Sequence, residues 1–335
     1  WSSDVCSSDL ALDAIAHRQP ARVPYDIQFT REARRRYAEF CGDADFESKL
    51  ANCFSIARVS TRVEVRPDIW RDEFGVLWDR SRDKDIGVVV NRLVGPENVR
   101  TFALPDPDDA AAVREVIALQ PRRADTLLLA KLSYNLFERA WALAGMEEVL
   151  MAMAVDKPFV HALLDRLTEY YLALIEAVMR HPVDGIFFGD DWGTQTGVIM
   201  GPALWREFLL PRVRKLYAAA KDRGGLVVLH CCGAVQELLP ELIDAGLDVF
   251  NPFQPEVMDV FEMKRRHGER LTFYGGISTQ RTLPFAPPQQ TADEVRRLVR
   301  EIGAGGGYIA SPAHAIPADA KPENVAVMID VLRGA

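Results

Sequence analysis

The stretch Leu226–Gly233, with the sequence LVVLHCCG, decides the predicted fold because a β-rich run leads directly into metal-capable side chains. Seven other β-rich runs lie along the chain, and helical patterns separate most of them. Alternating strands and helices predict a parallel sheet, and eight such units in 335 residues fit a single (β/α)8 TIM barrel. The predicted strands are Val23–Ile27, Ile56–Val65, Thr126–Leu132, Gly185–Gly189, Leu226–Leu229, Val249–Asn251, Leu271–Tyr274 and Tyr308–Ala310.

The longest interruption of this pattern runs from Asp68 to Leu104 and carries many charges. We expect a hairpin insertion here, after the second strand, with the hairpin around Gly87–Asn91. A doubly wound open sheet is the alternative fold, but no GxGxxG motif follows the first strand. No interdomain linker or fixed-period repeat is present, so residues 11–335 are predicted to form one domain.

The first ten residues, Trp1–Leu10, differ from the rest of the chain. They contain no initiator Met and no apolar run typical of a signal peptide. The decapeptide can be back-translated into a widely used sequencing-adapter sequence. We therefore interpret it as an adapter-derived, non-native tail fused to a truncated gene, with natural sequence beginning near Ala11. A short natural tail is the alternative. On the first interpretation, deleting Trp1–Leu10 should leave stability unchanged.

The composition is that of an ordinary globular protein, with 48% apolar and 26% charged residues. A net charge of −8 disfavours nucleic acid as a partner, because phosphate-binding surfaces need clustered Lys and Arg. No apolar stretch approaches the roughly 18 residues of a membrane span. Five cysteines are few and odd in number, which disfavours disulfides and indicates a reducing cytoplasm. A small molecule is the expected substrate.

Polar groups follow the predicted strands at the end where barrel enzymes place their active sites. The segments concerned are Gly189–Gly193, His230–Gly233, Asn251–Gln254, Gly275–Ser278 and Ser311–His314. From the sixth and seventh strands we expect substrate contacts by Asn251, Gln254, Gly276 and Ser278.

His230, Cys232 and His314 are the predicted metal ligands. Residues two apart on a strand point to the same side, so His230 and Cys232 can bind one ion while Cys231 points away. Imidazole and thiolate suit Zn²⁺, and a catalytic zinc commonly has three protein ligands and an open fourth position. His314 supplies the third ligand from the eighth strand, giving one zinc per chain. The alternative is a buried histidine beside two core cysteines.

Asp190 and Asp191 are the predicted catalytic carboxylates. Adjacent residues at a strand end face opposite ways, so one of them should point into the site, as an acid, a base or a group that orients a ligand. A loop acid that caps the helix beginning near Pro202 is the alternative. The pair Glu138-Arg139, after the third strand, fits either substrate contact or a helix surface.

Several of these motifs resemble the uroporphyrinogen decarboxylase superfamily, which includes zinc methyltransferases that work with corrinoid proteins. The resemblance begins with Ala11–Ile15 and the Arg22-Val23-Pro24 entry to the first strand. Gly189–Gln195, His230-x-Cys232-Gly233 and Asn251–Pro255 look like the methyltransferase-like branch. The resemblance implies a (β/α)8 barrel over the whole chain from about Ala11, and a homodimer.

Two departures from the family patterns bear on the reaction. Corrinoid-linked methyltransferases usually carry a Cys in an "SPGCG"-like segment, where this chain has Ser311-Pro312-Ala313-His314-Ala315. The decarboxylases carry an "RQAGRYxPE" motif whose arginines bind acidic groups, but Arg31–Glu39 lacks its Gly and Pro. The decarboxylases also lack the His-x-Cys pair.

The resemblance and the metal-capable residues together favour a zinc-dependent methyltransferase. The methyl group would pass to or from a corrinoid protein or a thiol at the mouth of the barrel. One alternative is a uroporphyrinogen decarboxylase-type carboxy-lyase acting on a porphyrinogen. A second alternative is a barrel that binds a small molecule or a corrinoid without turnover.

Overall fold

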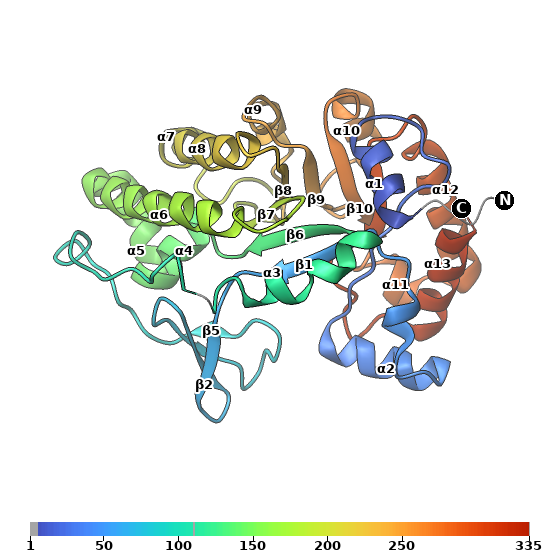
Figure 1. The fold of residues 1–335 in the computed structure, drawn as a ribbon, viewed down its shortest axis with the longest axis horizontal. Helices are drawn as coiled ribbons and strands as arrows, with labels where there is room; N and C mark the ends of the chain where they lie inside the picture. Colours follow the sequence, from blue (N-terminus) through green and yellow to red (C-terminus); the bar gives the residue numbers. More distant parts are fainter. Residues whose placement is uncertain (1–5, 110, 335) are drawn as a thin grey trace.

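The structure, a computed structural model, describes residues 6–109 and 111–334. Within these residues, seven parallel strands form one curled sheet in which each strand pairs with its neighbours in chain order. The sheet is the centre of a TIM-barrel-like arrangement, as predicted (Figure 1). Its strands are β1 (Phe54–Arg58), β6 (Leu127–Leu132), β7 (Gly185–Gly189), β8 (Leu226–His230), β9 (Val249–Phe253), β10 (Thr272–Ile277) and β11 (Tyr308–Pro312).

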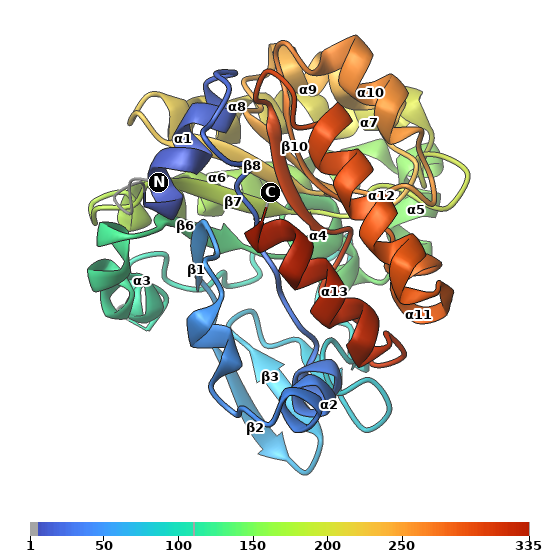
Figure 2. The same ribbon diagram turned by 90° about the vertical axis from the view of Figure 1, so that its right-hand side faces the viewer.

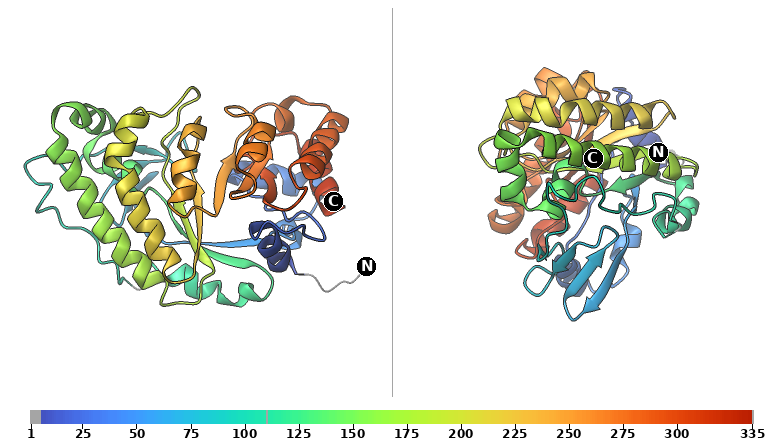
Figure 3. Two further views of the ribbon diagram at one scale, coloured as in Figure 1. Left: turned by 90° about the horizontal axis from the view of Figure 1, so that it is seen from above. Right: turned by 90° about the vertical axis from the view of Figure 1, so that its left-hand side faces the viewer.

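Helices cover the outside of the sheet, and most β-strands are followed by one, as the alternating pattern predicts. The long helix α6 lies beside α8 on the outer surface (Figure 3), and α12 packs against α13. The helices are α1 (Ser7–Ile15), α2 (Arg31–Cys41), α3 (Arg114–Ala118), α4 (Leu136–Ala144), α5 (Met146–Val155), α6 (Lys157–Val178), α7 (Pro202–Phe208), α8 (Leu210–Lys221), α9 (Leu239–Asp244), α10 (Val260–His267), α11 (Thr282–Phe285), α12 (Pro288–Glu301) and α13 (Pro322–Arg333). No helix in the described ranges has the length and apolar character needed to cross a bilayer.

The first predicted strand, Val23–Ile27, is not a strand in the structure, which makes only a single bridge there, from Tyr25 to Ala310. The segment still lies between β11 and β1. The amide of Ala310 donates to the carbonyl of Pro24 at 2.9 Å, and the amide of Cys53 donates to the carbonyl of Tyr25 at 3.0 Å. Regular pairing stops because Pro24 has no N–H and because the side chain of Asn52 bonds the backbone of Ile27.

An inserted antiparallel sheet follows β1 and projects from the barrel on the same side as α2 (Figure 2). The expected single hairpin around Gly87–Asn91 is not confirmed, because part of that stretch is the edge strand of this larger sheet. The predicted strand Ile56–Val65 is divided between the two sheets. The inserted strands are β2 (Arg62–Arg66), β3 (Ile69–Asp72), β4 (Leu77–Asp79) and β5 (Val88–Val89).

Buried Asp72 holds the inserted sheet to the barrel. Its carboxylate accepts hydrogen bonds from the amides of Phe74 and Val76 and from the indole of Trp78. It also pairs with the buried guanidinium of Arg139 on α4, at 2.6 Å. Removing one member of such a buried pair costs about 3–5 kcal/mol, so this contact fixes the insertion relative to α4.

The N-terminal residues pack more closely than the interpretation of Trp1–Leu10 as a foreign tail implies. Residues 1–5 lie outside the described part of the chain. Ser7–Leu10 begin α1, the amide of Ser8 donates to the carbonyl of Asp125 at 3.1 Å, and Leu10 is 3% exposed. The structure therefore gives these residues contacts with the barrel, whereas the adapter origin of the decapeptide stays a prediction.

A pair of deletions should separate the two parts of this segment. Removing residues 1–5 is the matched control, because it leaves the contacts of Ser8 and Leu10 in place. Removing residues 1–10 is expected to lower the free energy of unfolding by about 1.5–3 kcal/mol, the value of one fully buried Leu side chain. Thermal and urea unfolding of both truncated proteins measure this. Equal stability of the two would restore the interpretation of a tail that does not pack.

Candidate metal centre and active-site cavity

A cavity of about 880 Å³ lies at the carboxyl ends of the strands. Its lining includes Lys131 from β6, Gly189 from β7, His230 from β8, Asn251 from β9 and Pro312 from β11. The inserted sheet and α2 also contribute to its wall. This is the end of the barrel where the sequence predicted the active site.

The three predicted metal ligands come together beside this cavity, whose described lining includes His230 and His314 but not Cys232. One donor atom from each of His230, Cys232 and His314 lies within 4.8 Å of the others. The Sγ of Cys232 is 3.4 Å from the Nε2 of His230, and the two imidazole rings have centroids 5.4 Å apart. Two imidazoles and one thiol are a donor set that zinc prefers. The residues present therefore fit a zinc ion.

The ring of His230 is oriented by Asn251. The Nδ2 of Asn251 donates to the carbonyl of Tyr274 at 3.1 Å, which leaves its Oδ1 to accept from the Nδ1–H of His230 at 2.6 Å. That hydrogen bond selects the tautomer whose Nε2 lone pair faces Cys232. Burial lowers the pKa of His230 to about 4, so the ring is neutral at neutral pH and able to bind a metal.

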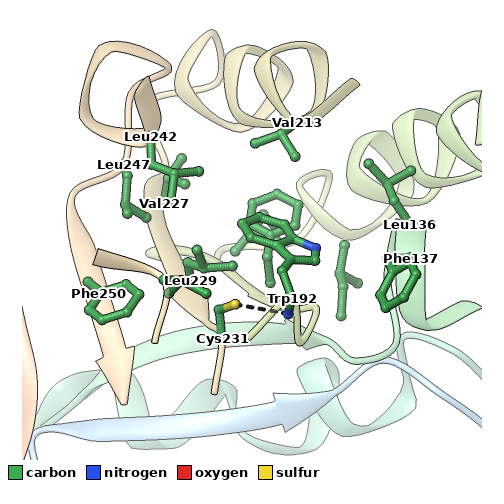
Figure 4. Packing of buried hydrophobic residues seen from close by; sticks show 14 of the residues in the cluster. Leu136, Phe137, Trp192, Val213, Val227, Leu229, Cys231, Leu242, Leu247 and Phe250 are labelled. Carbon is green, nitrogen blue, oxygen red and sulfur yellow. Dashed lines mark hydrogen bonds between the residues drawn. The ribbon is translucent and has the colours of Figure 1, made fainter. Parts of the chain in front are cut away.

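The two adjacent cysteines point in opposite directions, as strand alternation predicts. Cys231 is fully buried among apolar side chains, and its Sγ accepts a hydrogen bond from the amide of Trp192 (Figure 4). Cys232 lies beside His230 instead. Burial, and then the negative charge of Asp191, raise the pKa of Cys232, so its proton must be displaced by a cation for it to become a ligand.

Asp191 is the carboxylate of the aspartate pair that faces the cavity. Its Oδ1 accepts from the amide of Cys232 at 2.8 Å and lies 3.9 Å from the Nε2 of His230. The loops that hold these groups approach each other closely. A Cβ on Gly233, whose φ is +93°, would lie 2.4 Å from the backbone of Gly193. Glycine at both positions lets the loops after β7 and β8 meet.

Asp190 is buried and turned away from the cavity. Its carboxylate accepts hydrogen bonds from the amides of Phe137 and Glu138, at the start of α4, and from the indole of Trp192. Burial raises the pKa of Asp190 to about 7, although these hydrogen bonds oppose the shift. The residue caps α4, whereas the sequence had offered the helix near Pro202 as the one to be capped. Its catalytic role stays a prediction.

Of the four residues predicted to contact substrate, the structure places one in the cavity lining. Asn251 lines the cavity, whereas Gln254, Gly276 and Ser278 are absent from the part of the lining that the structure describes. Gln254 accepts a hydrogen bond from the amide of Gly233 at 3.2 Å. Ser278 accepts from the amides of Arg281 and Thr282, at the start of α11. These contacts hold loops at the rim.

Several residues of the cavity were not found from the sequence. Lys131, on β6, has its Nζ 4.8 Å from the ring centroid of Phe187, and burial lowers its pKa. The one available signal was a lysine inside an otherwise apolar strand, LLLAKL. Glu138, which the sequence left open, lines the cavity, and burial together with the charges of Asp191 and Asp190 raises its pKa.

The fold and the site define the class of protein. It has a TIM-barrel-like fold with a cavity at the carboxyl ends of the strands, the end where barrel enzymes place their active sites. The chain belongs to the uroporphyrinogen decarboxylase family, because residues 74–335 match the family described as "Uroporphyrinogen decarboxylase (URO-D)". Members of this superfamily include decarboxylases and methyltransferases, which agrees with the resemblance found in the sequence.

Curated relatives of both kinds are similar to this chain. A uroporphyrinogen decarboxylase of Pseudomonas fluorescens is 27% identical over 186 residues, or 54% of this chain and 50% of the relative. A methylated-thiol–coenzyme M methyltransferase of Methanosarcina mazei is 24% identical over 163 residues, or 49% and 42%. The chain thus spans about half the length of the curated relatives it matches.

Similarity to a solved structure extends over nearly the whole chain. A structure described as a methyltransferase from Methanosarcina mazei has a TM-score of 0.74 and covers 99% of both chains at 17% sequence identity. At that identity the likeness concerns the fold, and it supports the TIM-barrel-like architecture.

Proposed function

We propose that the protein is a zinc-dependent methyltransferase whose metal is held by His230, Cys232 and His314. The observation that carries the proposal is the convergence of these three donors within 4.8 Å of one another, two of them, His230 and His314, in the lining of the cavity. Three protein ligands with an open fourth position are the common arrangement of a catalytic zinc. The similarity to a methylated-thiol methyltransferase supports the same reaction class.

Zinc held at this position would lower the pKa of a thiol that joins it and keep the sulfur nucleophilic near neutral pH. In the proposed reaction a bond forms between the thiol sulfur and the methyl carbon. The bond from the methyl group to its donor breaks, and its electron pair stays with the donor. A methyl-corrinoid on a partner protein is the proposed donor, and a small thiol is the proposed acceptor.

The chain's own residues have three tasks in this proposal. Asn251 holds His230 in the tautomer that leaves Nε2 free. Asp191, which is partly exposed to the cavity, accepts the proton that the thiol loses. Lys131, a half-buried cation in the same cavity, favours an anionic sulfur over a neutral one.

Decarboxylation of a porphyrinogen is the second candidate. Several of the similar curated proteins are named uroporphyrinogen decarboxylase, and the cavity holds a carboxylate, Asp191, together with several arginines. In that reaction Asp191 would stabilise positive charge on a protonated ring. Decarboxylation gives the His230–Cys232 pair no role, so methyl transfer accounts for more of the site's residues.

An assay of two substrates with two forms of the protein tests the proposal. Zinc-loaded protein is expected to demethylate a methyl-corrinoid in the presence of a thiol, followed by the change in corrinoid absorbance. Chelator-treated protein is expected to lose this activity and to regain it with zinc. Neither form is expected to decarboxylate uroporphyrinogen. Decarboxylation by the metal-free protein would establish the second candidate instead.

A further inference from the structure

Besides the proposed metal ligands, the cavity lining is rich in arginine. Arg62 lies on β2, Arg80 follows β4, and Arg31 begins α2. In the described ranges, no carboxylate lies within salt-bridge distance of these three side chains or of Arg58. Three guanidinium groups without acidic partners thus line this cavity.

Arg80 gives the strongest evidence for an anion site, because this charged residue is only 8% exposed. Its guanidinium carbon is 5.2 Å from the ring centroid of Trp70, and its Nε donates to the carbonyl of Ile86 at 3.3 Å. Burial, and then the positive charges of Arg62 and Arg31, lower the pKa of Arg80. A buried cation that is repelled by two others is costly unless an anion enters the site.

Arg62 is held in place by aromatic rings and not by a counter-ion. Its guanidinium carbon lies 5.2 Å from the ring centroid of Trp78 and 5.4 Å from that of Tyr134. Stacking of this kind fixes the plane of a guanidinium while leaving its N–H groups free for a ligand. The guanidinium of Arg62 is therefore preorganised for an anion.

The acidic residues of the same cavity have other partners. Glu73 lies 3.7 Å from Arg139, Glu115 accepts from the amide of Arg58, and Asp83 accepts from the amides of Asp85 and Ile86. The charge of Asp83 does attract Arg80, but among the described residues no carboxylate, Asp85 included, lies within 4.0 Å of Arg62 or Arg80. Arg31 and Arg62 also lie outside residues 74–335, the part of the chain that matches the family.

We propose that Arg62 and Arg80, assisted by Arg31, bind a carboxylate or phosphate group of the substrate in the cavity that His230 and His314 also line. Guanidinium groups bind both anions through paired N–H donors. This inference rests on the proposed function only in taking the cavity as the substrate site. It identifies the substrate as a small molecule with an anionic end held by arginines and a reacting end near the metal ligands.

Calorimetric titration of the purified protein with inorganic phosphate and with tricarballylate, a tricarboxylate, tests this site without any turnover. Saturable binding of at least one anion is expected, and Arg62→Gln and Arg80→Gln should each weaken it about tenfold or more. Arg66→Gln removes the same charge from the same strand outside the cavity lining, so it is the matched control and should change affinity less than about twofold. Arg80→Lys keeps the charge but loses the paired donors and should fall between wild type and Arg80→Gln.

Each outcome has a defined meaning. Binding of phosphate alone supports a phosphorylated substrate, and binding of tricarballylate alone supports a carboxylic acid. Equal weakening by Arg66→Gln and Arg62→Gln would show general charge attraction and overturn the site, as would the absence of saturable binding to wild type. Arg62 is only partly buried, so Arg62→Gln remains informative if Arg80→Gln fails to fold. Because anion binding needs no zinc, failure of this inference is distinguishable from failure of the methyltransferase proposal.

Discussion

Replacing Cys232 with Ser is expected to reduce bound zinc from about one ion per chain to a trace, and to abolish methyl transfer. The change removes one of three donors that lie within 4.8 Å of one another, and a hydroxyl is a poor zinc ligand beside a thiolate. Metal analysis of the purified variant, with competition by a chromogenic chelator, gives the zinc content and the affinity.

Cys231→Ser is the matched control for this experiment. It makes the same chemical change one residue away, at a side chain that points into the apolar cluster around Trp192 (Figure 4). Zinc content should stay near one ion per chain, while the melting temperature falls slightly because a hydroxyl is buried among apolar groups. Equal zinc loss in both variants would contradict the assignment of Cys232, since the two sulfurs face opposite ways.

His314→Ala is expected to weaken zinc binding by more than about 100-fold, beyond what the loss of an outer hydrogen-bond partner costs. His314 comes from the loop after β11, far in sequence from the other two ligands, and its ring lies 5.4 Å from that of His230. The measurement is zinc affinity by chelator competition, with turnover of the methyl-corrinoid as the second readout.

Rescue by His314→Cys distinguishes a ligand from a substrate-binding group. Thiolate and imidazole are both good zinc donors, so His314→Cys should recover most of the zinc affinity that His314→Ala loses. A histidine that only contacts substrate would leave zinc affinity intact in His314→Ala. That result would remove His314 from the metal site and leave two protein ligands.

Local sequence patterns were sufficient for most of the barrel and for the convergence of His230, Cys232 and His314, whose binding of a metal stays a prediction. Six β-rich runs became barrel strands because each is a short, largely buried segment, whereas Ile56–Val65 is divided between β1 and β2. The two-residue spacing of His230 and Cys232 brought their donor atoms together. The strand predicted at Val23–Ile27 failed because pairing there depends on Asn52, whose side chain replaces a ladder partner. That partner is 25 residues away and leaves no local pattern.

The remaining features of the site depend on contacts between distant segments. The sequence predicted that one of Asp190 and Asp191 faces the site, but the choice is made by the amides of α4, which bind Asp190. Arg62, Arg80 and Arg31 come from β2, the segment after β4 and α2. They indicate an anion site because none of them has a carboxylate partner within salt-bridge distance among the described residues. Neither the orientation of Asp190 nor the unpaired state of the arginines can be predicted from the spacing of residues in the sequence.

The attachment of the inserted sheet through Asp72 and Arg139 has a consequence for how this scaffold can diversify. The proposed metal ligands belong to β8 and to the loops after β8 and β11, whereas Arg62 belongs to a separate antiparallel sheet anchored at α4 and Arg80 directly follows its strand β4. Mutations on the face of that sheet can therefore change which substrates are accepted while the reacting centre stays intact. The inserted sheet and the proposed metal site can therefore be varied separately, in evolution or in engineering, as long as the Asp72–Arg139 pair that attaches the sheet is kept.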